Sequence, residues 1–395
     1  MIVQINLTKR EAQCFDIRKL TPKETGRLMG LREESLDRLM ACTENDKMRS
    51  GDNLHVSVYR RLTNSSLYKL FGNSIVVDVL AAIYKELWYH DPSEHQQAQL
   101  SLFAEPEWHL ERPKVAHVAT LCSGYDSQCL AFDALRQWAV ETGHEPMDYE
   151  LVVWAEFDPD SKAPLERQPA VVAHNALFPD ASGLNVGDMT CADWSSVRQR
   201  IGDTEIDLLT YSTPCQSISQ AGKRAGIAKD SGTRSAVLWY TEEAIRHLKP
   251  RVLLQENVAA LVNQQNAADF RQWRQTVERL GYRSYWAVLN ARDYGILEAL
   301  GPVPQNRERL FMISVRQDLC PGAPYPFPNP MPLTRTIADV LDEDVSENFF
   351  LKPESVVSFL TRNENGDECL YRVSDHLPTP DEIREWVREE GHTLS

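Results

Sequence analysis

Cys215 has the sequence surroundings of a nucleophile. It follows Pro214 and the apolar run IDLLTYS (206–212), so it lies where a buried strand ends and a loop begins. Lys223 and Arg224 follow closely, and positive neighbours lower the pKa of a thiol and favour the nucleophilic thiolate. Because a lone cysteine is usually a small buried apolar residue, its place at a strand end is what favours catalysis here.

Carboxylates end three other apolar runs. Glu256 follows RVLLQ, and an acid in apolar surroundings holds its proton more tightly, so it could act as a general acid near neutral pH. Glu156 ends a second run, followed by Asp158, and Asp188 ends a third. An acidic residue at the tip of the second strand can accept both hydroxyls of a ribose. Each carboxylate could equally cap the helix that follows it, so the residues alone leave both interpretations open.

Two further signals are weak when each is taken alone. The turn LCSGYDSQ can present backbone N–H groups to a polar ligand at the start of a helix, but it contains only one glycine, Gly124. Arg307 and Arg309 are spaced by two and so project from one face of an incoming strand, which suits paired contacts to oxygen atoms. Surface ion pairs are the commoner role for such arginines.

Seven short β-rich runs, separated by helical stretches, must position these residues. Apolar strands that alternate with helices predict a doubly wound α/β domain with a Rossmann-like, mostly parallel, seven-stranded sheet, accompanied by a small second domain. Ligands bind such sheets at the carboxyl ends of the strands. The runs are residues 115–121, 150–158, 184–188, 206–212, 251–258, 284–290 and 309–315.

The flanking segments predict helices and two boundaries. Residues 16–45 are expected to be helical, with Thr21 as N-cap, and a second helix is expected to begin near Ser74. A polar, proline-punctuated linker and a proline-rich stretch after residue 317 mark the boundaries. The predicted parts are residues 1–89, the linker 90–113, a catalytic domain 114–316 and a small domain 317–395.

Composition limits the classes of protein. With 42% hydrophobic and 25% charged residues among 395, the chain is ordinary for a globular protein, which excludes wholesale disorder. No apolar run reaches the length of a membrane span, the N-terminus lacks an apolar signal region, and eight cysteines without CxxC pairs predict a reduced, cytoplasmic protein without a zinc site. The net charge of −15 opposes nucleic-acid binding overall, but residues 213–251 hold seven basic and three acidic residues. A solvated loop and helix face explains that local excess equally well.

Taken together, the motifs resemble those of the cytosine-5 DNA methyltransferases that use S-adenosylmethionine. STPCQS, QENV and QNRERLF occur in that family's order, behind a series of strand-end acids. RKLTPKETGRLMG and LFGNSIVV are similar to the ninth and tenth blocks, which close the family's sequence but come first here. The resemblance covers about residues 16–316 and implies a class I methyltransferase fold in circularly permuted order, with the linker joining the old ends.

The resemblance implies a role for each matching position. It makes Cys215 the nucleophile and Glu256 the acid at cytosine N3, and Arg307 and Arg309 would face the cytosine carbonyl and the phosphate. Pro214, Gln216 and Asn257 would shape the catalytic site. The implied S-adenosylmethionine contacts are Ser123, Gly124, Tyr125, Asp126, Glu156, Phe157, Asp188, Met189, Asn73 and Ser74, with Gly72 beside them. The implied contacts to double-stranded DNA, around a flipped base, are Ser217, Gly222, Lys223, Arg224, Lys229, Arg234 and Gln305.

Two departures from the family's pattern change what we expect. The first block has Cys122 where the family usually has an aromatic residue, and it has fewer glycines, so Asp126 or Ser127 could reach the cofactor instead. The family's target-recognition region would occupy only 95 residues, 317–395 and 1–16, so it either reads a very short site or is completed by a separate polypeptide. The predicted function is DNA cytosine-5 methylation in a bacterial restriction-modification or phage-borne system. The alternatives are a tRNA cytosine-5 methyltransferase and a catalytically idle DNA-binding or regulatory paralogue.

Overall fold

The computed structural model describes residues 18–43, 62–91, 108–214, 234–320 and 322–350. The chain forms two compact units. One comprises residues 28–335, and the other joins the two ends of the chain, residues 1–27 and 336–395. These divisions differ from the expected boundaries at 89, 113 and 316, because the helices before the linker pack into the core of the larger unit.

The larger unit is built on a six-stranded mixed sheet with the order β2-β1-β3-β4-β6-β5. The strands are β1 (Val115–Leu121), β2 (Asp148–Ala155), β3 (Leu208–Tyr211), β4 (Val252–Val258), β5 (Tyr282–Asn290) and β6 (Glu308–Arg316). The first four are parallel, and β6 runs antiparallel to both of its neighbours. The α/β class and the mostly parallel sheet agree with the sequence-based prediction.

The prediction of a seventh strand at residues 184–188 is wrong. This run makes only an isolated bridge, in which Asn185 pairs with Trp154 and the Val186 N–H donates to the Trp154 carbonyl at 2.9 Å. The Asn185 side-chain oxygen accepts from the N–H groups of Glu156 and Gly187 at 3.1 and 2.9 Å. Gly187 then adopts a φ of 71°, which turns the chain out of the extended conformation.

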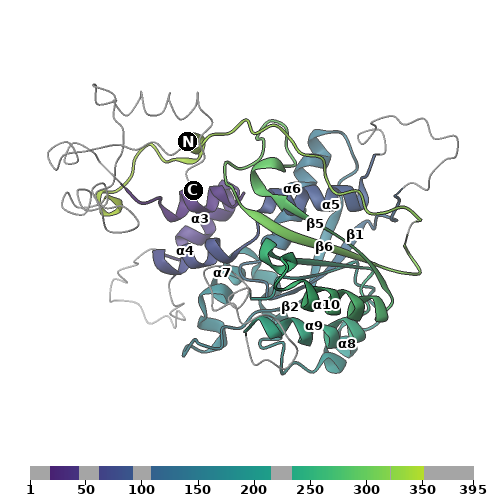
Figure 1. Cartoon of the computed structure of the whole chain (residues 1–395). Helices are drawn as coiled ribbons and strands as arrows, with labels where there is room; N and C mark the ends of the chain where they lie inside the picture. Colours follow the sequence, from purple (N-terminus) through teal and green to yellow (C-terminus); the bar gives the residue numbers. More distant parts are fainter. Residues whose placement is uncertain (1–17, 44–61, 92–107, 215–233, 321, 351–395) are drawn as a thin grey trace, which may run out of the picture. The chain divides into compact units, whose positions relative to one another are not determined.

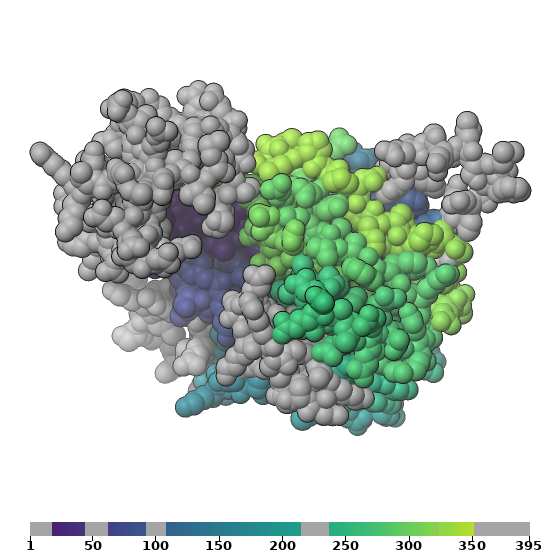
Figure 2. Space-filling view, in the orientation of Figure 1, coloured from purple at the N-terminus to yellow at the C-terminus, as the bar shows by residue number. Residues whose placement is uncertain are grey.

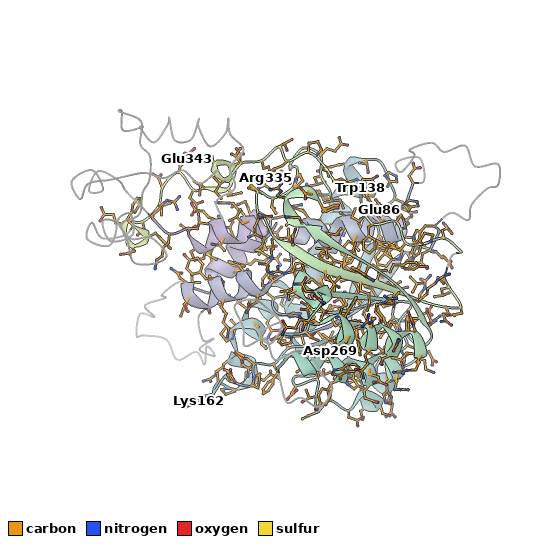
Figure 3. All side chains as sticks on the ribbon, in the orientation of Figure 1. Glu86, Trp138, Lys162, Asp269, Arg335 and Glu343 are labelled. Carbon is orange, nitrogen blue, oxygen red and sulfur yellow. The ribbon has the colours of Figure 1, made fainter. Side chains whose placement is uncertain are left out.

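Helices cover both faces of the sheet, and Figure 1 shows α5 and α6 on one side and α8, α9 and α10 on the other. The first face also carries α7, and each face has its own apolar cluster, with alternate strand residues pointing into each. Figure 3 labels Trp138 of α6 and Asp269 of α10, which lie on opposite sides of the sheet. The helices are α5 (Val77–Trp88), α6 (Ser127–Glu141), α7 (Pro169–Leu177), α8 (Trp194–Ile201), α9 (Thr241–Leu248) and α10 (Ala267–Arg279).

The edge strand β5 is the least covered part of the sheet. Its side chains alternate between partly buried and exposed, and Trp286 is 42% exposed. Figure 2 shows this green part of the chain on the near face of the unit. The described residues also contain short 3-10 turns, at Leu165–Arg167, Pro179–Leu184, Arg234–Tyr240, Ala259–Val262, Ala291–Asp293, Ile337–Val340 and Glu347–Phe349.

The N-terminal helical prediction is correct in type but wrong in its boundaries. Residues 16–45 contain two helices, α2 (Pro22–Leu28) and α3 (Glu33–Ala41), because Gly30 adopts a φ of 78° between them. The predicted cap is confirmed, since the Thr21 hydroxyl accepts from the Glu24 N–H at 3.1 Å. The helix expected near Ser74 is α5, and a further helix, α4 (Asn64–Asn73), precedes it.

The expected linker ends in buried residues. Trp108 and Leu110 are 4% and 5% exposed, and the Trp108 indole N–H donates to the Leu87 carbonyl of α5 at 3.4 Å. Within the described ranges, Asn64–Trp88 is the one helical stretch long and apolar enough to span a membrane, but 61% of its most apolar window is buried inside the protein. That burial is typical of a core helix.

The smaller unit is held together by contacts between the two ends of the chain. The Lys19 N–H donates to the Phe349 carbonyl at 2.9 Å, and Arg18 and Phe350 form an antiparallel bridge. The fully buried Glu24 carboxylate accepts from both terminal guanidinium nitrogens of Arg18 at 2.7 Å and from the Asp342 N–H at 2.8 Å. Burial raises the pKa of Glu24, but these hydrogen bonds outweigh burial, and the net pKa lies below its usual value.

Glu24→Ala should therefore loosen the smaller unit. The variant leaves the Arg18 guanidinium and the backbone N–H groups of Thr21 and Asp342 without their acceptor, and breaking a buried pair costs about 3–5 kcal/mol. Hydrogen–deuterium exchange should become faster over residues 18–27 and 336–350 while α6 stays protected. Glu34→Ala is the matched control because Glu34 makes only an exposed helix-surface pair with Arg38. Unchanged exchange in Glu24→Ala would contradict the role given to this carboxylate.

Candidate active site

A cavity of about 450 Å³ opens at the carboxyl ends of the parallel strands, where the fold places ligands. Its walls come from the loops after β1, β2 and β3, from the end of β4, from the start of β6 and from α4 with the residues that follow it. All the predicted cofactor residues except Asp126 line one part, and the described catalytic residues Pro214, Glu256, Asn257, Arg307 and Arg309 line another. One continuous space therefore joins groups that are distant in sequence.

Glu156 is the central acceptor in the cofactor part. It follows β2, and one carboxylate oxygen accepts from the Gly124 N–H at 2.7 Å, which ties the second strand end to the turn after the first. Burial, together with the nearby charges of Asp158 and Asp126, raises the pKa of Glu156 to about 7 against the hydrogen bond from Gly124. The carboxyl group is therefore poised to change its charge near neutral pH.

Asp188 and Met189 line the same part of the cavity. One oxygen of the Asp188 carboxylate accepts from both the backbone N–H and the hydroxyl of Thr190, at 2.9 and 2.8 Å, which orients the carboxylate. The Met189 sulfur lies 3.7 Å from the thiol of Cys122, which adopts a φ of 54°. Burial, followed by the charges of Glu156 and Asp188, raises the pKa of the Cys122 thiol far above its usual value, so this thiol stays protonated.

The first block is arranged differently from the expectation at Asp126. This residue is fully buried and does not line the cavity; its carboxylate accepts from the Thr120 hydroxyl at 2.7 Å and caps α6 through the Cys129 N–H. His174 of α7 lies 3.4 Å away on the core side. Asp126 itself adopts the left-handed conformation, with a φ of 67°, at the N-cap of α6. Ser123, Gly124, Tyr125 and Ser127 do line the cavity.

Aromatic surface in the cavity comes from residues other than Cys122. Tyr125 is 1% exposed and packs edge-on against Phe71 of α4, with ring centroids 5.7 Å apart. Phe157, next to Glu156, lines the cavity and is 38% exposed. Phe157 therefore leaves an apolar ring open to a ligand.

The GNS block lies in the same cavity. Gly72, Asn73 and Ser74 line it, and one terminal nitrogen of Arg307 donates to the carbonyls of Gly72 and Ser74 at 3.0 and 2.6 Å. Lys69 of α4 reaches the Asp158 carboxylate at 3.4 Å on the cavity wall. Residues near position 72 and near position 307 thus meet only through the fold.

Glu256 is the centre of the catalytic part. It is 5% exposed, and one of its oxygens lies 3.1 Å from the Nε of Arg309 while the other accepts from the Ser212 hydroxyl. Burial raises the pKa of Glu256, and the Arg309 charge, the Ser212 hydrogen bond and the Arg307 charge only partly oppose it. The Asn257 side chain donates to the Thr213 carbonyl at 3.3 Å, which holds the loop that leads to Pro214.

Several predicted residues cannot be placed in this geometry. Arg234 is the first residue of a 3-10 turn. The Gln305 N–H donates to the Val303 carbonyl, and Gln305 does not line the cavity. Cys215, Gln216, Ser217, Gly222, Lys223, Arg224 and Lys229 lie outside the described residues. In the part of the chain that is described, no group of three or more acidic, histidine or cysteine side chains could hold a metal ion.

Sequence reasoning missed several cavity residues that have polar roles, and Ser212 and Lys69 are two of them. Ser212 contacts Glu256, and Lys69 contacts Asp158. The register could have identified Ser212, since it directly follows a strand that pairs with the strand of Glu256. No signal in the sequence relates Lys69 to Asp158, because they meet only when α4 packs beside the end of β2.

The comparison with known families agrees with this arrangement. The model of the C-5 cytosine-specific DNA methylase family matches residues 173–380, more than half of the chain. The chain belongs to this family. The matched residues include Cys215, Glu256, Arg307 and Arg309.

Individual relatives match the chain over shorter stretches. The Type II methyltransferase M2.ScrFI of Lactococcus lactis subsp. cremoris is 45% identical over 152 residues, 38% of this chain and 39% of the relative. The orphan methyltransferase M.SssI of Spiroplasma monobiae is 40% identical over 150 residues, 37% of this chain and 36% of the relative. The chain thus spans less than two fifths of the length of either protein. The solved structure of Dnmt2 methyltransferase from S. pombe is 15% identical, with a TM-score of 0.32, over 51% of this chain and 49% of that one.

Proposed function

We propose that the protein is a DNA cytosine-5 methyltransferase that transfers a methyl group from S-adenosylmethionine to carbon 5 of a flipped cytosine. The observation that carries the proposal is the joining of two sets of groups in one cavity. Glu156 and Asp188 lie with Gly124 in one part, and Glu256 lies with Arg309 in the other. A methyl donor and an acceptor base need such a shared space.

The cofactor part suits S-adenosylmethionine. The half-buried Glu156 carboxylate at the second strand end is an acceptor for ribose hydroxyls, and Asp188 offers an acceptor for the amino group of adenine. Phe157 and Met189 provide apolar surface for a ring, and Ser123, Gly124, Tyr125, Asn73 and Ser74 would surround the methionine end. When bound, S-adenosylmethionine supplies the methyl group as an electrophile.

The residues of the chain would make cytosine reactive. The Cys215 thiolate adds to carbon 6, and the electron pair of the carbon 5–carbon 6 double bond moves toward N3, which takes a proton from Glu256. Carbon 5 would then act as a nucleophile and take the methyl group, with S-adenosylhomocysteine as the leaving group. Loss of the carbon 5 proton to a base would restore the double bond and expel the Cys215 thiolate, and N3 would return its proton to Glu256. Arg309 orients Glu256, and Asn257 holds the loop that leads to the nucleophile.

Reaching the base requires it to leave the DNA helix. A stacked cytosine cannot enter a cavity at the strand ends, so it must be flipped out. In the sequence, Cys215 is followed by the basic residues Lys223, Arg224, Lys229 and Arg234 with Asp230 among them, and this local excess suits phosphate contacts. The chain as a whole has a net charge of −15.

We also propose that the family's blocks are circularly permuted. The GNS block near position 72 lines the same cavity as the first block near position 124, which supports one methyltransferase unit in altered order. Segments from both termini share the smaller unit, in line with a recognition region that is split between them.

A covalent trap tests the function. The purified protein is mixed with S-adenosylmethionine and mixed-sequence duplex DNA that contains 5-fluorocytosine, and a denaturation-resistant adduct is sought. Fluorine cannot leave as the proton does, so the methyltransferase should stall on DNA. An adduct that forms with tRNA but not with DNA would show that the substrate is RNA. Cofactor binding without an adduct on either substrate, under conditions where a control methyltransferase is trapped, would favour an idle regulatory protein.

The pKa of Glu156 predicts a pH dependence of cofactor binding. The ionised carboxylate accepts two hydroxyl hydrogen bonds, and its pKa of about 7 means that it becomes protonated as the pH falls through 7. Affinity for S-adenosylhomocysteine should therefore be about tenfold weaker at pH 6 than at pH 8 when measured by calorimetry. Glu156→Gln should bind weakly with a much flatter profile, and the ligand's own titration is common to both proteins. Parallel profiles in the two proteins would refute the assignment.

A further inference from the structure

We propose that Ser212 is a positioning residue for Glu256, whose carboxyl group it holds in both the protonated and the ionised state. The inference rests on the proposed function, because it assigns Glu256 the transfer of a proton to cytosine N3. The two claims fail in different ways in the experiment below.

The fold places Ser212 beside Glu256. Ser212 directly follows the last residue of β3, and Tyr211 of β3 pairs with Gln255 of β4, so the next residues along the two parallel strands are neighbours. The Ser212 N–H donates to the Leu121 carbonyl of β1 at 3.3 Å, which fixes the backbone. The Ser212 hydroxyl then donates to one oxygen of Glu256. The register of β3 and β4 therefore brings the two side chains together at the carboxyl ends of the strands.

The two contacts of the carboxyl group differ in chemistry. Arg309 contacts the other oxygen through its Nε at 3.1 Å, and a guanidinium can only donate hydrogen bonds. Arg309 therefore favours the ionised carboxylate and cannot accept a hydrogen bond from the neutral acid. A hydroxyl can donate to the anion and, after rotating, accept from the acid. Ser212 is thus the contact that suits both states of a group that must gain and lose a proton in each cycle.

Because Glu256 is buried, loss of the hydrogen bond from Ser212 should have a large effect. Glu256 is 5% exposed, so water cannot readily replace a missing partner. Burial raises the pKa of Glu256, and the hydrogen bond from Ser212 is among the interactions that lower it. Removing the hydroxyl should raise the pKa further and let the carboxyl group rotate away from cytosine. Both effects act on the chemical step and neither touches the cofactor part.

The test compares Ser212→Ala and Ser212→Thr with the unsubstituted protein. Single-turnover methylation of duplex DNA is measured between pH 6 and 9, together with thermal unfolding and binding of S-adenosylhomocysteine. In Ser212→Ala we expect a plateau rate about tenfold lower, consistent with one lost hydrogen bond to a charged group. The alkaline limb, where Glu256 loses its proton, should move about half to one pH unit upward. Ser212→Thr keeps the hydroxyl and should keep the position of that limb.

The same substitution in a Glu256→Gln background separates positioning from structure. If Ser212 acts through Glu256, Ser212→Ala should reduce the rate of Glu256→Gln by less than twofold. A tenfold loss in that background, or a Ser212→Ala profile identical to that of the unsubstituted protein, would overturn the inference alone. Failure of the unsubstituted protein to methylate or trap cytosine would instead overturn the proposed function. Normal cofactor binding and unfolding temperature show that a variant is folded.

Discussion

Cys215→Ala should form no covalent adduct with 5-fluorocytosine in DNA or RNA. The adduct is a bond between the cysteine sulfur and carbon 6, so its loss should be complete rather than partial. Among the described residues that line the cavity, no thiol offers a second nucleophile in its place. Cys122 lines it, but burial and two neighbouring carboxylates raise the pKa of that thiol and keep it protonated. The measurement is the fraction of protein shifted on a denaturing gel after incubation with the trap.

A matched cysteine variant controls for the loss of a thiol. Cys191 is exposed and lies outside the cavity wall, so Cys191→Ala should form the adduct at the normal rate. Binding of S-adenosylhomocysteine by Cys215→Ala should stay within about twofold of normal, because the predicted cofactor contacts are unchanged. An adduct that survives Cys215→Ala would show that another residue is the nucleophile.

Glu256→Gln should lower the single-turnover rate about 10²- to 10⁴-fold, the range over which a positioned general acid contributes. Glutamine has nearly the same shape and can still contact Arg309 and Ser212, but it cannot give a proton to N3. The thiolate would then have to add to a ring whose developing charge is not neutralised. The rate is measured with radiolabelled methyl groups on duplex DNA.

The control for this variant is a glutamate on the outer surface of α10. Glu278 makes a long, partly exposed pair with Arg274, so Glu278→Gln should methylate at the normal rate. Cofactor binding should be normal in both variants, because Glu256 lies in the catalytic part of the cavity. A Glu256→Gln rate within threefold of normal would remove Glu256 from the chemistry.

The sequence by itself determined the class of fold and most of the site's composition. Apolar runs alternating with helices predicted the α/β sheet, since a strand that is buried on both faces must be apolar throughout. The same runs identified the strand ends at Glu156 and Glu256, because parallel strands bring their carboxyl ends to one edge. Asp188 was identified as well, although its run does not form a strand. The capping box at Thr21 was also predictable, since it depends on residues only three positions apart.

Only the tertiary structure decided which way individual side chains point and what they contact. The run at residues 184–188 has the pattern of a strand, but it forms only an isolated bridge, and the Asn185 side chain accepts from two backbone N–H groups. Asp126 lies in a turn that lines the cavity, yet its carboxylate accepts from Thr120 and caps α6 in the core. Local patterns describe how apolar a segment is, not how its polar groups are satisfied.

The same limit applies to pairs of residues from distant segments. Ser212 and Glu256 meet through the register of two strands, and Arg307 meets Gly72 across 235 positions of sequence. The pKa of Glu156 depends on its burial and on the hydrogen bond from Gly124, neither of which its own segment reveals. The sequence determined which chemical groups the site contains, whereas the packed sheet decided their partners and their charge, because both depend on distance and burial.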